Sequence, residues 1–221
     1  VDPNDIPAVA IVDPELMYSM PKGLTAATGM DALTHAIESY ITPGAWVMSD
    51  MFELKAIEMI AQNLKAAVDN GKDVAAREAM SQAQYIAGMG FSNVGLGIVH
   101  SMAHPLGAFY DTPHGVANAL LLPYVMEYNA ESPAAPKYIH IAKAMGVDTT
   151  GMSEAEGVKA AIEAVKALSI SINIPQKLHE INVKEEDIPA LAVAAYNDVC
   201  TGGNPRPTSV ADIEALYHKA F

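Results

Sequence analysis

The pattern of apolar and polar residues changes once along the chain, near residue 14. Residues 7–12 form a short and mostly apolar run, Pro-Ala-Val-Ala-Ile-Val, which predicts a buried strand. No second strand-like run follows it, and a lone strand cannot satisfy its own backbone hydrogen bonds. We therefore expect residues 1–14 to be the stub of another domain and this chain to be the C-terminal part of something longer.

Helical periodicity dominates after residue 14, with apolar residues three and four positions apart and breaks at Gly, Pro and Asn. The predicted helices span residues 25–40, 49–68, 73–89, 98–103, 113–128, 136–145, 153–168, 185–198 and 208–221. Asp50 is expected to cap the second helix, and Pro105 to distort or end the fourth. The sequence thus predicts a mainly α protein with one all-helical domain over residues 15–221.

Composition and charge restrict which binding partners and which cellular compartment we expect for this protein. Apolar residues make up 51% of the chain, and the formal net charge of −13 opposes binding to nucleic acid or to an anionic membrane. No apolar run reaches the roughly 20 residues that a membrane-spanning helix needs. The single cysteine, Cys200, cannot form an intrachain disulfide and fits the cytoplasmic location that we expect.

Two histidine-containing segments carry the candidate chemistry. Asp31 and His35 are four residues apart on the predicted helix 25–40, so their side chains share one face. His100 and His104 repeat this spacing, and His114 follows after a Thr-Pro turn. One carboxylate oxygen and three imidazole nitrogens suit a divalent metal such as Zn²⁺ or Fe²⁺. Apolar neighbours predict that both segments are buried, and a buried carboxylate needs a partner.

Three longer stretches contain these residues. Residues 23–40 read Gly-Leu-Thr-Ala-Ala-Thr-Gly-Met-Asp-Ala-Leu-Thr-His-Ala-Ile-Glu-Ser-Tyr, residues 95–107 read Gly-Leu-Gly-Ile-Val-His-Ser-Met-Ala-His-Pro-Leu-Gly, and residues 113–118 read Pro-His-Gly-Val-Ala-Asn. They resemble the signatures of the iron-containing (group III) alcohol dehydrogenases, and the resemblance runs from about residue 9 to residue 221. It implies a dehydroquinate synthase-like helical metal-binding domain. It also implies a metal-dependent, NAD-linked oxidoreductase that interconverts a small alcohol or diol and its aldehyde.

The resemblance also implies roles for single residues. Carried over position by position, it makes four residues the metal ligands: Asp31, His35, His100 and His114. His104 matches the histidine that lies beside the metal and the nicotinamide without binding the metal, and we expect it to relay a proton.

Three further positions have weaker assignments. Phe91 and Cys200 fall where the resemblance places the lining of the substrate pocket, although ordinary core packing is an equal alternative for both. Met17 is a candidate for contact with the cofactor. The resemblance favours Fe²⁺, whereas the ligand set would also accept Zn²⁺.

The resemblance also implies an α/β dinucleotide-binding domain before this one, and residues 1–14 would be its terminal strand. The glycine-rich phosphate loop of that domain has no counterpart here. The Gly88–Gly90 and Gly95–Gly97 pairs lie in or between predicted helices and follow no strand, so they do not match a phosphate-binding loop. We therefore expect NAD(H) to be bound mainly by the absent N-terminal domain and this chain alone to be inactive. The full-length protein is expected to be a homo-oligomer.

Three alternatives remain open at this point. One is a zinc-dependent enzyme similar to glycerol dehydrogenases. Another is a metal-dependent hydrolase, for which Glu38, one turn beyond His35, is the nearest candidate base. The third is a non-catalytic helical domain that binds metal for stability, although an unliganded neighbour such as His104 would be unusual in a closed structural site.

Overall fold

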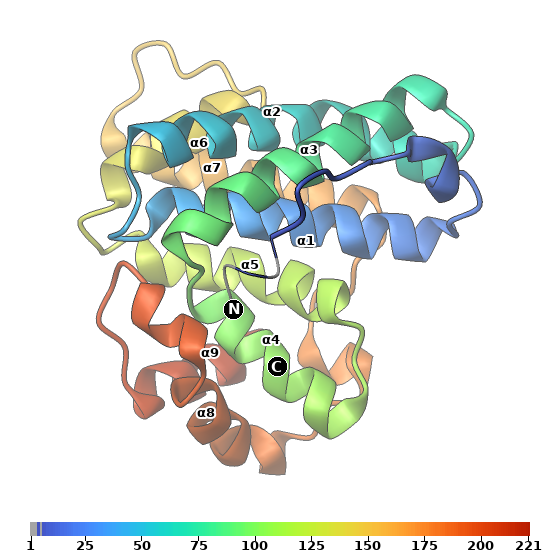
Figure 1. The fold of residues 1–221 in the computed structure, drawn as a ribbon. Helices are drawn as coiled ribbons and strands as arrows, with labels where there is room; N and C mark the ends of the chain where they lie inside the picture. Colours follow the sequence, from blue (N-terminus) through green and yellow to red (C-terminus); the bar gives the residue numbers. More distant parts are fainter. Residues whose placement is uncertain (1–3, 5) are drawn as a thin grey trace.

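In the computed structural model, which describes residue 4 and residues 6–221, all regular structure is helical. The α-helices are α1 (Lys22–Ile41), α2 (Val47–Asp69), α3 (Val74–Val94), α4 (Ile98–Tyr110), α5 (His114–Asn129), α6 (Tyr138–Ala144), α7 (Glu154–Ser171), α8 (Ile188–Tyr196) and α9 (Val210–Ala220) (Figure 1). Short 3-10 helices are η2 (Pro14–Met17), η3 (Ala135–Lys137), η4 (Leu178–Ile181), η5 (Glu185–Asp187) and η6 (Val199–Gly203). The prediction of an all-helical domain is confirmed for this part of the chain.

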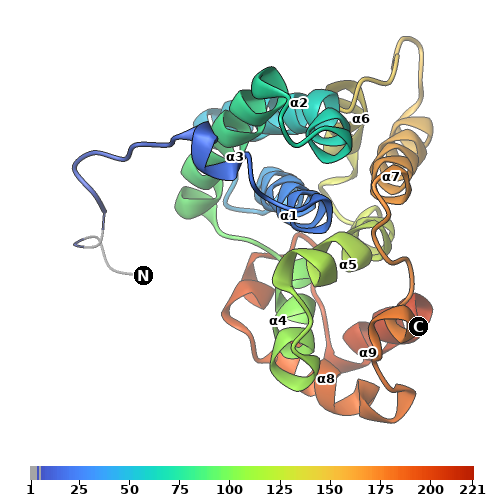
Figure 2. The same cartoon turned by 90° about the vertical axis from the view of Figure 1, so that its right-hand side faces the viewer.

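The predicted strand at residues 7–12 is wrong for the residues that the structure describes. This segment has no regular structure, and its residues Val9 and Ile11 are 77% and 90% exposed. A strand needs a neighbour to pair its N–H and C=O groups, and residues 4 and 6–221 supply none. Figure 2 shows the segment leading away from the helices. The predicted domain boundary after residue 14 stays a prediction.

Helix α1 lies at the centre of the molecule. It packs on α2 and α3 on one side and on α5 on the other (Figures 1 and 2). α5 in turn packs on α4, α4 on α8, and α8 on α9. Met30, Leu33 and Ile37 of α1 are completely buried. A helix that is covered on nearly all sides can hold polar groups only where they meet partners, so its polar residues mark specific contacts.

Two helices run further than the sequence suggested. α3 continues through Gly90 to Val94. A Cβ at Gly90 would lie only 1.9 Å from Glu53 Oε1, so this glycine allows α2 and α3 to pack closely and does not end the helix. α4 continues through Pro105 to Tyr110, and the expected end at residue 103 is wrong. Proline removes one helical hydrogen bond, but buried side chains on both sides of it hold α4 against its neighbours.

Side chains cap the N-termini of α3, α7 and α9. Ser153 and Glu156 form a capping box at the start of α7, and Asn70 follows the last residue of α2. Asp50 does not cap α2, because the helix begins earlier and the Ser49 hydroxyl accepts the Trp46 N–H instead. None of the helices in the described part of the chain is long and apolar enough to cross a membrane.

Candidate metal centre

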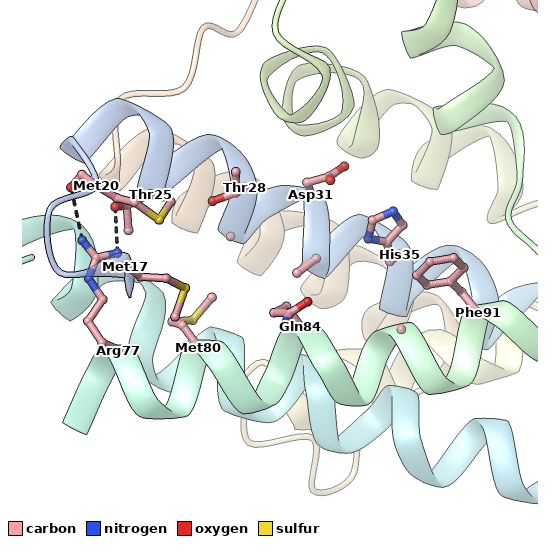
Figure 3. A pocket seen from close by; sticks show the side chains of 13 residues that line it. Met17, Met20, Thr25, Thr28, Asp31, His35, Arg77, Met80, Gln84 and Phe91 are labelled. Atoms are coloured by element: carbon pink, nitrogen blue, oxygen red, sulfur yellow. Dashed lines mark hydrogen bonds between the residues drawn. The ribbon is translucent and has the colours of Figure 1, made fainter. Parts of the chain in front are cut away.

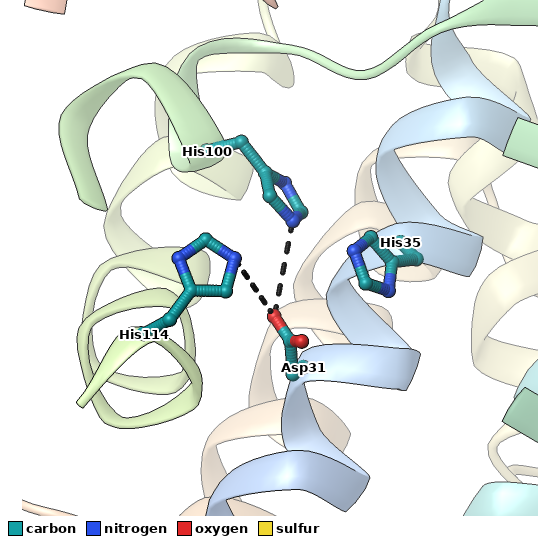
Figure 4. Close-up of side chains that lie close together, drawn as sticks. All are labelled: Asp31, His35, His100 and His114. Carbon is teal, nitrogen blue, oxygen red and sulfur yellow. Dashed lines mark ion pairs between the residues drawn. The ribbon is translucent and has the colours of Figure 1, made fainter. Parts of the chain in front are cut away.

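The four predicted ligands come from three helices and meet at one point. Asp31 and His35 lie one turn apart on α1, His100 lies in the first turn of α4, and His114 is the first residue of α5. One ligand atom from each of them lies within 4.8 Å of all the others. Figure 4 shows the three imidazoles arranged around the Asp31 carboxylate. The cluster can thus offer one oxygen and three nitrogens to a single ion.

A close contact between backbones sets the position of His114. A Cβ on Gly115 would lie 2.4 Å from the Ala27 carbonyl oxygen, so only glycine lets the first turn of α5 press against α1. As a result, His114 Nε2 lies 3.5 Å from Asp31 Oδ1.

Burial keeps these imidazoles in the form that binds metal. It lowers the pKa of His35 to about 4, against the opposing effect of Asp31, and it also lowers the pKa of His114. Both rings are therefore neutral at neutral pH, and a neutral imidazole has a free nitrogen lone pair.

His100 provides the strongest sign that an ion belongs here. Its Nε2 is buried, has no hydrogen-bond partner among the described residues, and lies 3.8 Å from Asp31 Oδ1. A buried polar atom without a partner is costly, and a metal ion placed between these atoms would satisfy it. The residues present therefore fit a divalent metal.

Glu38 does not lie where a general base for hydrolysis would have to lie, on the open side of the metal ligands. Its side chain is 2% exposed, Oε1 accepts the Val99 N–H at 2.7 Å, and Oε2 lies 2.6 Å from His100 Nδ1. The carboxylate thus lies behind a ligand and is not free to activate a water molecule. Its spacing of three residues from His35, among apolar neighbours, was the available signal for a buried contact.

Asn118 is a second residue that the sequence reasoning missed. It is fully buried on α5, and its amide nitrogen donates to Asp31 Oδ1 at 2.6 Å and lies 2.9 Å from His114 Nε2. It follows His114 by four residues, so both share one face of α5. That spacing could have identified it as a residue that orients the Asp31 carboxylate.

His104 lies beside the cluster without joining it. Its ring stacks on that of His114 at 5.3 Å between centroids, and its Nδ1 lies 2.7 Å from Asp198 Oδ2. Burial raises the pKa of Asp198, but hydrogen bonds from the Cys200 N–H and from His104 outweigh it and leave that pKa below its ordinary value. Asp198 is 94 residues away from His104 in the sequence, so no local spacing could have identified it.

Phe91 and Cys200 line one cavity of about 520 Å³, together with residues 92–96, 199 and 202–203. The Phe91 ring also stacks on the His35 ring, with 4.5 Å between the ring centroids. Burial, and after it the charge of Asp198, raises the pKa of the Cys200 thiol to about 12, so this side chain is an uncharged lining group. Both residues are partly exposed at a cavity. Their role towards a substrate stays a prediction.

A second cavity of about 490 Å³ extends along α1 and α3. Figure 3 shows His35 and Phe91 at one end of it and Met17 with Met20 at the other. Met17 therefore lies in the same cleft as two of the predicted ligands, Asp31 and His35. Whether it touches a cofactor stays a prediction.

Known proteins of similar sequence are alcohol dehydrogenases and aldehyde reductases. The lactaldehyde reductase of Escherichia coli strain K12 is 59% identical over 221 residues, which cover 100% of this chain and 57% of that protein. The NAD-dependent methanol dehydrogenase of Bacillus methanolicus is 45% identical, over 100% of this chain and 58% of its own length. The chain thus spans little more than half the length of these relatives.

A solved structure and a family profile agree with these relatives. The crystal structure of a 1,3-propanediol oxidoreductase superposes with a TM-score of 0.96 at 47% identity, covering 98% of this chain and 56% of that one. Residues 25–221 match the profile of the Fe-containing alcohol dehydrogenase family, C-terminal. This chain therefore belongs to the iron-containing alcohol dehydrogenase family, to whose C-terminal domain it corresponds.

Proposed function

We propose that this chain is the metal-holding part of an NAD-linked oxidoreductase that interconverts a small alcohol or diol and its aldehyde. Lactaldehyde and 1,2-propanediol are the favoured pair, because a lactaldehyde reductase is 59% identical over the full chain. The observation that carries the proposal is the meeting of Asp31, His35, His100 and His114 beside two cavities. The NAD-dependent methanol dehydrogenase among the relatives supports NAD as the cofactor.

Asp31, His35, His100 and His114 would hold the ion, with Fe²⁺ favoured by the family and Zn²⁺ compatible with the donor set. When bound, such an ion supplies Lewis-acid stabilisation of negative charge on the alcohol oxygen. With a divalent ion, three neutral imidazoles and the Asp31 carboxylate would leave one net positive charge on the ion and its four ligands.

His104 would move the proton that the alcohol loses. A hydrogen bond between its Nδ1 and the Asp198 carboxylate keeps the imidazole in a fixed orientation beside His114. The His104 side chain is 42% exposed, which gives it access to solvent. Phe91 and Cys200 would limit the substrate to a small molecule by lining the adjacent cavity.

NAD(H) would be bound mainly by the part of the longer relatives that this chain does not span. Met17 would add a contact from the cleft that runs to His35. We propose that the full-length enzyme is a homo-oligomer.

A full-length form of this protein should oxidise NADH in the presence of lactaldehyde, with about one metal ion per subunit. Asp31→Ala and His100→Ala should lose both metal and activity, since each removes a ligand. His218→Ala, at an exposed position on α9, is the matched control and should keep both. Full metal content in the Asp31 variant would contradict the ligand assignment. Reconstitution with Fe²⁺ or Zn²⁺ would tell the iron enzyme from its zinc-dependent alternative.

A further inference from the structure

The buried carboxylate of Glu38 connects two helices at the back of the metal centre. It comes from α1, and both of its hydrogen-bond partners, the Val99 N–H and His100 Nδ1, lie in the first turn of α4. We propose that Glu38 is a positioning residue that fixes the tautomer and the orientation of His100 for metal binding. The inference rests on the proposed function, since it assumes that the cluster binds an ion.

The tautomer of His100 follows from its two neighbours. Glu38 Oε2, at 2.6 Å from Nδ1, is an acceptor when the carboxyl group is ionised, so Nδ1 must carry the hydrogen. A neutral imidazole then has its lone pair on Nε2. His100 Nε2 is one of the buried atoms without a hydrogen-bond partner in the described part of the chain, and it points at the Asp31 carboxylate. Glu38 thereby presents the correct nitrogen to the ion.

The same carboxylate fixes where α4 begins. The Val99 N–H is one of the first amides of the helix, which have no partner within the helix itself. Gly97, the residue before α4, has no side chain to supply a cap, and a Cβ there would lie 2.8 Å from Glu38 Oε1. Glu38 therefore caps α4 from a different helix, where a negative charge is also favoured by the helix dipole.

One face of α1 supplies two of the metal ligands and the residue that holds a third. Asp31, His35 and Glu38 follow one another at spacings of four and three residues, so they lie on the same helix face. The first two supply ligand atoms directly, and the third holds the ligand that α4 supplies. Rotation or displacement of α4 relative to α1 would break both Glu38 hydrogen bonds and move Nε2 away from the ion.

Glu38→Gln tests this positioning role with little change in volume. A glutamine has one carbonyl oxygen and one amide NH₂, so it can accept from Val99 or from His100 but not from both. When its NH₂ faces His100, Nδ1 must become the acceptor, and the proton then sits on Nε2, where it blocks the ligand lone pair. We expect Zn²⁺ and Co²⁺ to bind about 10- to 100-fold more weakly than to the unaltered chain. The visible absorption of bound Co²⁺ should change as well, because the ligand geometry changes.

Glu53→Gln is the matched control, because it replaces another completely buried glutamate that contacts none of the four ligand side chains. It should bind both ions like the unaltered chain and give the same Co²⁺ spectrum. Asp31→Ala separates the inference from the proposed function. If that variant binds Zn²⁺ normally, the metal site itself is misplaced. If it loses Zn²⁺ while Glu38→Gln binds within twofold of the unaltered chain, only the role of Glu38 is wrong.

A measurement on the unaltered chain covers the case in which Glu38→Gln does not fold. Nitrogen-15 NMR of the Zn²⁺-loaded chain, with the ring nitrogens of His100 assigned through its own backbone resonances, should show a protonated Nδ1 in slow exchange with water and an Nε2 bound to Zn²⁺. A protonated Nε2, with Nδ1 as the ligand, would overturn the inference.

Discussion

Glu53→Gln should make the protein more stable at neutral pH. Glu53 is completely buried on α2, and its Oε1 lies 2.5 Å from the Ser39 hydroxyl oxygen. The same hydroxyl donates to the His35 carbonyl oxygen, which can only accept. The serine has one hydrogen for these two contacts, so a protonated Glu53 that donates to Ser39 would remove the competition between them. Burial raises the pKa of Glu53 to about 8, in agreement with this.

The size and the sign of the effect follow from the two protonation states. The pKa of Glu53 is raised by folding from an ordinary value of 4.5 to about 8. The stability that depends on this group is therefore fully present below pH 4.5 and is lost as pH rises through 8. At about 1.4 kcal/mol for each pH unit above 4.5, keeping the proton costs the folded state about 3 kcal/mol at pH 7. A glutamine needs no proton, and its amide nitrogen can donate to Ser39 in the same place.

Urea denaturation of the metal-free chain at pH 5, 7 and 8.5 measures this directly. The free energy of unfolding of Glu53→Gln should exceed that of the unaltered chain by about 3 kcal/mol at pH 7 and by less than about 1 kcal/mol at pH 5. Glu163→Gln, at a position 65% exposed on α7, should show neither effect. If Glu53→Gln is equally stable or less stable at pH 7 and 8.5, Glu53 is ionised in the folded protein and the hydrogen-bond argument fails.

Three further predictions concern the metal centre. In the full-length enzyme, His104→Gln should keep the metal but lower kcat by about 100-fold or more, since glutamine cannot take up and release a proton; loss of metal would instead make His104 a ligand. Gly115→Ala should weaken Zn²⁺ binding and lower the free energy of unfolding by about 1–3 kcal/mol, because its Cβ would lie 2.4 Å from the Ala27 carbonyl oxygen. Gly107→Ala, whose Cβ would meet the Thr112 carbonyl oxygen at an ordinary 3.6 Å, is its control, and equal Zn²⁺ affinity in the two variants would speak against the proposed packing of α5. The 221-residue chain itself should bind Zn²⁺ but bind NAD⁺ only very weakly, since no strand–glycine-loop–helix unit occurs among its described residues; micromolar NAD⁺ binding in a calorimetric titration would place the cofactor site on this chain.

Local spacing predicted the helices and one pair of ligands. Periodicity of 3.6 residues placed all nine α-helices of the described chain, and the four-residue spacing of Asp31 and His35 put both on one helix face. The partners of that pair come from α4 and α5, more than 60 residues further on. Only the resemblance to a known family linked these segments, because spacing within one helix carries no information about a different helix.

The misreadings have a common cause. The local preferences of Gly90 and Pro105 predict helix ends, but each residue lies inside a helix whose packing outweighs those preferences. The apolar run at residues 7–12 predicted a strand, which no neighbour among the described residues completes. Asp198 and Glu38 act through partners 94 and 62 residues away, so their contacts became visible only in the folded chain.

The distribution of the ligands over α1, α4 and α5 makes an ion a cross-link between distant parts of the chain. An unfolded chain holds these four side chains far apart, so the ion binds the folded state in preference. By mass action, free metal at 100 times its dissociation constant would then stabilise the fold by about 2.7 kcal/mol. The resistance of this domain to heat and denaturant would therefore depend on the concentration of free metal. A shortage of metal would lower the stability of the fold as well as the activity.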